Sequence, residues 1–212
     1  VYGRALWVTD GARSQARTTP RGWTVWSGGD WLERRFQDAE NPISAPAIMV
    51  RTSLHQRVGG YDPQLPKAAD MELFMRLSAY ADVGFLRGVD QAFYRIHSSN
   101  MHNAVDAVMD LRQRRAVFET VLERYGHAIK DPERLSRTVH RQLGKEALWA
   151  GGRIYDRGPL RRSELGRKLL GAGQNEEQAV DEALAFAVEC WPEVQRARLY
   201  KTLAARGRLS PM

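Results

Sequence analysis

Carboxylate, guanidinium and imidazole side chains that could do chemistry are concentrated between residues 41 and 102. Asp62 follows a pair of glycines, Asp70 stands where a helix is predicted to begin, and Arg95 and His97 lie close together near the end. The helix macrodipole favours the ionised form of a carboxylate at a helix N-terminus, which applies to Asp70. These residue types transfer protons, bind phosphate oxygens and coordinate divalent cations.

Residues 1–103, which would position these side chains, are predicted to have α/β structure. β-like runs, turns and short helices alternate here, whereas an almost wholly helical pattern follows. Short apolar runs predict strands at residues 6–8, 47–50, 83–86 and 92–94. Two helices are expected: one capped by Thr52 and stopped by Gly59-Gly60, and one over residues 70–80.

Residues 104–212 are predicted to be helical. The first helix is expected to start at Asn103 with Asp106 and to end before Gly126. The second starts with Asp131 as its cap and Pro132 at the first helical position, and is expected to run toward Gly151-Gly152. Its apolar positions are Leu135, Val139, Leu143 and Ala147. Further helices are expected near Asn175 and from Pro192.

Four motifs follow one another between residues 51 and 97. They are Arg51 at a predicted strand end, the turn Val58-Gly59-Gly60-Tyr61-Asp62, the helix start ADMELFMRL at residues 69–77, and Tyr94-Arg95-Ile96-His97. With Asn41-Pro42 before it, this block resembles the acceptor-side half of the catalytic domain of family 2 glycosyltransferases. The resemblance implies a partial GT-A-like α/β domain at residues 1–103, followed by an α-helical extension at residues 104–212.

The resemblance also implies roles for individual residues. Asp70 matches the general base that deprotonates an acceptor hydroxyl. His97 matches a late histidine that helps to hold Mg²⁺ or Mn²⁺, Arg95 would meet a phosphate oxygen, and Asp62 would face the acceptor. The implied activity is sugar transfer with inversion, from a nucleotide-diphosphate sugar donor to a glycan or another hydroxyl acceptor.

Structural interpretations of the same residues remain open. Asp70 could cap its helix, His97 could be a structural histidine, and Gly59-Gly60 could serve only to form a positive-φ turn before Asp62. Arg76 is interpreted as structural, because it can pair with Glu72 one helical turn away.

Three tryptophans, Trp23, Trp26 and Trp31, are predicted to lie in a Gly-rich loop. Exposed aromatic rings can stack on a sugar face, and Trp23 and Trp26 are the candidates for such contact with the acceptor. Tryptophans also anchor loops to a core, and the sequence leaves both interpretations open.

The nucleotide-binding half of such an enzyme is not recognisable in the sequence. Relatives carry a D-x-D motif that grips the metal ion and the diphosphate, and no D-x-D occurs here. Asp38-Ala39-Glu40 has a similar outline, but it follows a helix-like segment. Residues from Val1 onward resemble the stretch after that motif and lack an initiator methionine, so we expect a fragment that is inactive without the missing half.

The net charge of +7 permits anionic partners without selecting one. Nucleic-acid binding is not expected, because the arginines lack the aromatic interleaving of known modules. The apolar runs are too short to span a membrane, and the single Cys190 is predicted to be buried, in a reducing compartment. The resemblance suggests a bacterial cytoplasmic setting with peripheral association at the inner membrane. The alternative function is a non-catalytic helical module that binds a protein partner or an anionic membrane surface.

Overall fold

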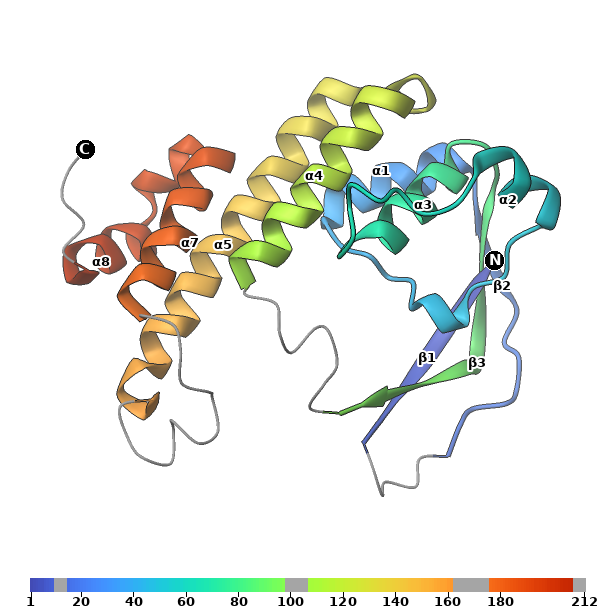
Figure 1. The fold of residues 1–212 in the computed structure, drawn as a ribbon, viewed down its shortest axis with the longest axis horizontal. Helices are drawn as coiled ribbons and strands as arrows, with labels where there is room; N and C mark the ends of the chain where they lie inside the picture. Colours follow the sequence, from blue (N-terminus) through green and yellow to red (C-terminus); the bar gives the residue numbers. More distant parts are fainter. Residues whose placement is uncertain (10–14, 98–106, 162–175, 208–212) are drawn as a thin grey trace. The chain divides into compact units, whose positions relative to one another are not determined.

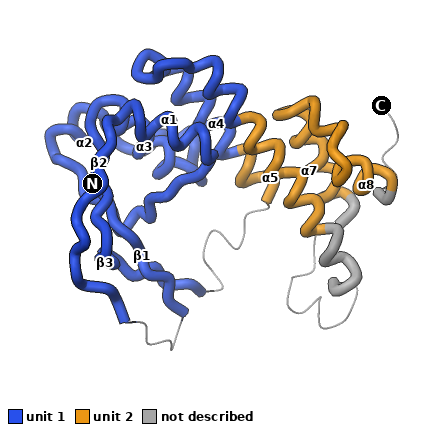
Figure 2. The backbone as a smooth tube through the Cα atoms, turned by 180° about the vertical axis from the view of Figure 1, so that it is seen from behind, with its two compact units in different colours: residues 1–105, 113–139 blue, residues 106–112, 140–212 orange. Residues whose placement is uncertain are grey.

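The computed structural model describes residues 1–9, 15–97, 107–161 and 176–207. The chain forms two compact units, the first of residues 1–105 and 113–139 and the second of residues 106–112 and 140–212 (Figure 2). The predicted α/β character is confirmed, because a three-stranded sheet combines with helices. The predicted boundary between residues 103 and 104 lies outside the described residues and stays a prediction.

The sheet of the first unit has the strand order β1-β3-β2 (Figure 1). Its strands are β1 (Tyr2–Thr9), β2 (Trp23–Trp26) and β3 (Val83–Ile96). β1 runs parallel to β3, and β2 runs antiparallel to the first part of β3. The prediction of two separate strands at residues 83–86 and 92–94 was wrong. Gly88, at φ 85°, lets a single strand continue through both segments.

The strand predicted at residues 47–50 was also wrong. Residues Ala45–Ala47 form a 3₁₀ turn, η1, and of the following residues only Ile48 makes a β-bridge, to Tyr2. A strand needs a partner along its length, and among the described residues this segment pairs only through the Ile48–Tyr2 bridge and the hydrogen bonds between Met49 and Val1.

Three helices pack in the first unit beside the sheet. They are α1 (Gly28–Asp38), α2 (Thr52–Val58) and α3 (Ala69–Ser78). The Ser27 hydroxyl caps α1 by accepting a hydrogen bond from the Asp30 N–H at 3.1 Å. Trp31, predicted to lie in a loop, is instead buried on α1 together with Leu32 and Phe36.

Two long helices, α4 (Ala107–Tyr125) and α5 (Pro132–Arg161), each contribute to both units. In the first unit, the ring of Phe118 on α4 lies 4.9 Å from that of Phe36 on α1. The predicted start of α5 is confirmed, because the Asp131 carboxylate accepts a hydrogen bond from the Arg134 N–H at 3.0 Å. The four apolar positions predicted for this helix are all fully buried. Asn103 and Asp106, the predicted start of α4, lie outside the described residues.

The second unit contains the remainder of α5, α7 (Glu176–Cys190), the 3₁₀ helix η4 (Pro192–Arg196) and α8 (Arg198–Gly207). Gly151-Gly152 does not end α5. A Cβ on Gly151 would lie 3.4 Å from that of Ala183, so the glycine permits close packing against α7. Cys190 is buried, as predicted. None of the described helices has the length and apolar character needed to cross a membrane.

Candidate functional site

An ionic clamp joins α3 to the turn that follows α2. Glu72 is fully buried, and its two carboxylate oxygens accept hydrogen bonds from Nε and Nη2 of Arg76, both at 2.9 Å. The same guanidinium donates to the backbone oxygens of Val58 and Gly60, both at 2.6 Å. The predicted pairing of Arg76 with Glu72 is confirmed. We refer to Glu72, Arg76 and the turn at Val58–Gly60 as the clamp.

The turn itself depends on Gly59. This residue adopts φ 88° and ψ −176° and ends α2, with its N–H donating to the carbonyl of His55 at 2.8 Å. The predicted positive-φ turn is therefore confirmed. The predicted cap at the other end was wrong, because Arg51 is the N-cap, without a side-chain bond, and Thr52 is already helical.

Asp62 lies just after the turn and binds two donors. Oδ1 accepts a hydrogen bond from the Gln64 N–H at 2.9 Å, and Oδ2 accepts one from Arg124 of α4, also at 2.9 Å. The backbone N–H of Gln64 and the Arg124 guanidinium hold the pKa of Asp62 below its ordinary value. The carboxylate thus links the turn to α4. Its contact with an acceptor stays a prediction.

Asp70 is half-buried in the first turn of α3. Its Oδ1 accepts a hydrogen bond from the N–H of Met71 at 2.7 Å. The structural interpretation of Asp70 as the helix cap was wrong, because Ala68 occupies the N-cap position. The proximity of the helix N-terminus favours an ionised carboxylate. Its role as a base stays a prediction.

Arg95 and His97 lie at the far end of β3. Arg95 is exposed and pairs in register with Val8 of β1, whereas His97 is half-buried and follows the last strand residue. In the ranges that the structure describes, no three His, Cys, Asp or Glu side chains are grouped so that they could hold a metal ion. The roles of Arg95 at a phosphate and of His97 as a ligand of Mg²⁺ or Mn²⁺ stay predictions.

Trp23 and Trp26 lie in β2 and not in the predicted loop. The Arg34 guanidinium lies 5.7 Å from the centre of the Trp26 ring. Trp23 is 51% exposed and lines a cavity of about 500 Å³. The predicted contact of these two rings with a sugar stays a prediction.

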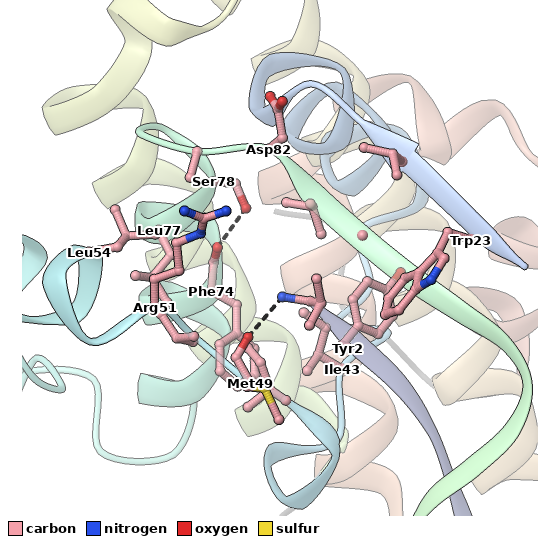
Figure 3. Close-up of a pocket in the computed structure, with 17 residues that line it drawn as sticks. Tyr2, Trp23, Ile43, Met49, Arg51, Leu54, Phe74, Leu77, Ser78 and Asp82 are labelled. Carbon is pink, nitrogen blue, oxygen red and sulfur yellow. Dashed lines mark hydrogen bonds between the residues drawn. The ribbon is translucent and has the colours of Figure 1, made fainter.

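The cavity opens between β1, β2, the segment after η1 and the C-terminal end of α3 (Figure 3). Its apolar wall includes Tyr2, Trp23, Ile43, Met49, Phe74 and Leu77. Arg51 and Asp82 are the charged side chains among the lining residues. Asp70 is not among the lining residues and lies about 6 Å along the helix axis from Phe74, the nearest lining residue of α3. Sequence reasoning missed the cavity because its walls come from segments far apart in the chain.

Comparisons of the chain with protein-family models, with curated proteins and with solved structures give no significant match. The resemblance to family 2 glycosyltransferases therefore depends on the motifs alone.

Proposed function

We propose that this chain is the acceptor-side part of an inverting glycosyltransferase, with Asp70 as the general base. The observation that carries the proposal is the clamp. It joins two of the motif segments, the Gly59-Gly60 turn and the start of α3, into one hydrogen-bonded unit, and Asp70 lies on α3 two residues before Glu72. A catalytic base needs such fixed surroundings.

The two carboxylates at the start of α3 have different environments. Glu72 is fully buried and bound by Arg76, so it is committed to structure. Asp70 is only half-buried and lies where the helix dipole favours its charged form. Of the two, Asp70 is therefore the carboxylate suited to accept a proton from a hydroxyl group.

In the proposed reaction, Asp70 removes the proton from the acceptor hydroxyl as its oxygen attacks the anomeric carbon of the donor sugar. The bond from that carbon to the nucleoside diphosphate breaks on the opposite face, which inverts the configuration. Arg95 would contact a phosphate oxygen, and His97 would contribute one ligand to a divalent cation. The nucleotide and the other metal ligands would be held by a polypeptide unit outside this sequence.

The test is sugar transfer by a protein that also carries a nucleotide-binding unit, with nucleotide-diphosphate sugars as donors. Asp70→Asn should lower kcat about 10²–10⁴-fold, the usual contribution of a general base. Asp110→Asn, on α4, is the matched control and should keep the activity. Unchanged turnover of Asp70→Asn would refute the base assignment. This chain alone should show negligible transfer.

One observation favours the alternative of an interaction module. A hollow of about 540 Å³ on the second unit is lined by Arg196, Arg198, Lys201, Thr202 and Ala205, without an acidic side chain. Such a surface attracts anionic partners, and its binding weakens with salt. Salt-sensitive binding to vesicles that contain phosphatidylglycerol, lost in Arg198→Glu, would support this function, and its absence would remove it.

A further inference from the structure

The segment before β2 is tied to the middle of β3 by backbone hydrogen bonds at both of its ends. At one end, the N–H of Asp90 donates to the carbonyl of Arg17 at 2.9 Å. At the other end, the N–H of Arg21 donates to the carbonyl of Arg87 at 2.8 Å, and the N–H of Arg87 donates to the carbonyl of Gly22 at 3.0 Å. The loop between these two ends therefore has a shape that the sheet sets.

Gly88 lets this loop lie directly on β3. It has φ 85°, a conformation that favours glycine. A Cβ at this position would lie 2.5 Å from the carbonyl oxygen of Thr19 and 2.7 Å from Cγ of Arg21, closer than van der Waals contact allows. The loop and the strand border a hollow of about 360 Å³, which we call the β3 hollow. It is lined by Gln15, Ala16, Arg17, Thr18, Thr19, Arg21 and Gly88.

The carboxylate of Asp90, beside the β3 hollow, is committed to Arg17. The Asp90 side chain is only 2% exposed, and its two oxygens accept hydrogen bonds from the backbone N–H and from Nη2 of Arg17, both at 2.8 Å. Nε of Arg4 also approaches Oδ1, at 3.6 Å. The charge of Asp90 is therefore already matched and does not offset that of Arg21.

Positive charge exceeds negative charge at the β3 hollow. Arg21 is exposed and lines it, and the described residues of its lining include no carboxylate. Arg87, also exposed, adjoins the same end of the loop, because its Nη2 would lie 3.3 Å from a Cβ on Gly22. Like charges on paired segments repel each other. A bound anion would offset this repulsion.

The β3 hollow also offers uncharged donors. Thr18, Thr19 and Gln15 line it and carry hydroxyl and amide groups. A guanidinium fork binds two oxygens of a phosphate group at once. A phosphate ester presents up to three acceptor oxygens, more than a carboxylate has, and so makes use of the hydroxyl donors as well.

We infer that the β3 hollow binds the phosphate group of a phosphate ester. The guanidinium of Arg21 makes the principal contact, and the hydroxyl groups of Thr18 and Thr19 donate to the remaining oxygens. The described lining residues belong neither to the clamp nor to the apolar cavity. The inference goes beyond the proposed catalysis and does not depend on it.

The test titrates the whole chain with inorganic phosphate at constant ionic strength, with chloride as the balancing ion. Binding is followed by the backbone signals of Thr18, Thr19 and Gly88 in two-dimensional amide NMR spectra. We expect these signals to shift and to saturate with phosphate. Chloride alone should not shift them, because a spherical ion does not match the guanidinium fork.

Variants place the binding at the β3 hollow. Arg21→Gln removes the guanidinium at an exposed position and should weaken phosphate binding at least about tenfold. Arg21→Lys keeps the charge but loses the fork, so its affinity should be intermediate. Thr19→Val removes one hydroxyl donor and should weaken binding about twofold or more. Arg137→Gln, at an exposed position of α5, is the matched control and should bind phosphate like the parent chain.

Two further ligands identify the source of the phosphate group, and either result supports the inference. Tighter binding of glycerol phosphate than of inorganic phosphate would assign the site to a soluble ester. Sedimentation with vesicles that contain phosphatidic acid, reduced in Arg21→Gln, would assign it to a lipid headgroup.

The inference would be overturned by any of three results. They are amide signals that do not move, equal shifts with chloride at the same ionic strength, and equal affinities of Arg21→Gln and Arg137→Gln for phosphate. Asp70→Asn should leave phosphate binding unchanged, so the proposed catalysis can fail without affecting this outcome.

Discussion

The guanidinium of Arg124 donates a hydrogen bond to Oδ2 of Asp62 at 2.9 Å and so connects α4 to the turn after α2. The clamp holds the other side of the same turn through Arg76. The segment that resembles a glycosyltransferase acceptor site is therefore held from α3 and from α4. Of these two helices, α4 lies in residues 104–212, which the sequence predicted to be a separate helical extension.

Acid should weaken the contribution of Asp62 to stability. Its pKa in the folded chain lies below its ordinary value of 3.8. The stabilisation is therefore fully present above pH 3.8 and is lost as the pH falls through the folded pKa. Urea unfolding from neutral pH into the acid range should show that Asp62→Asn differs from the parent chain at neutral pH and converges with it in acid. A constant difference would contradict this assignment.

Removing the cation of the clamp should be severely destabilising. Arg76→Ala leaves the carboxylate of Glu72 fully buried without its partner, which typically costs about 3–5 kcal/mol. Urea unfolding followed by tryptophan fluorescence would measure the change. Arg137→Ala, at an exposed position of α5, should change stability by less than about 0.5 kcal/mol. Similar losses in both variants would mean that the clamp contributes little.

The two glycines of the turn should respond differently to alanine. Gly59 has φ 88° and ψ −176°, a region that only glycine occupies readily, so Gly59→Ala should cost about 1–3 kcal/mol. A Cβ on Gly60 would meet no atom within 4 Å, so Gly60→Ala should be nearly neutral. The difference in the free energy of unfolding between the two variants is the measurement. Equal effects would refute the positive-φ requirement.

Loss of the Phe118 ring should destabilise the first unit. The ring is fully buried against Phe36, and truncation of such a residue to alanine costs about 3–5 kcal/mol. Hydrogen exchange of the α1 amides should therefore accelerate in Phe118→Ala. Met109→Ala, at a position that is 44% exposed, should leave α1 unaffected. If α1 exchange did not change in Phe118→Ala, α4 would not be part of the packing of the first unit.

Local patterns were sufficient for several helices and not for the sheet. Asp131-Pro132 and the apolar spacing from Leu135 predicted the start and the buried side of α5, because capping and periodicity act within one helix. Gly151 was misread as a helix end, since its role is set by Ala183 on another helix. The segment at residues 47–50 has strand-forming residues, but a strand also needs a neighbour that local sequence does not specify.

In the candidate site, too, contacts within one helix were predictable and contacts between distant segments were not. The pairing of Arg76 with Glu72 follows from a spacing of one helical turn and was predicted. The hydrogen bond from Arg76 to the backbone oxygen of Val58 was not predicted. Arg124 was missed as the partner of Asp62 because nothing in the sequence brings these positions together. The cavity lined by Trp23 was missed for the same reason.

The strand order of the sheet determines when the sheet can form during synthesis of the chain. β1 and β2 both pair with β3, which is the last of the three strands to be synthesised. At about 5–20 residues per second, the ribosome needs several seconds to add residues 10–82 after β1. During that interval β1, with Tyr2, Leu6 and Trp7, has no strand to join. β1 therefore completes its pairing in the sheet only after β3 has been synthesised.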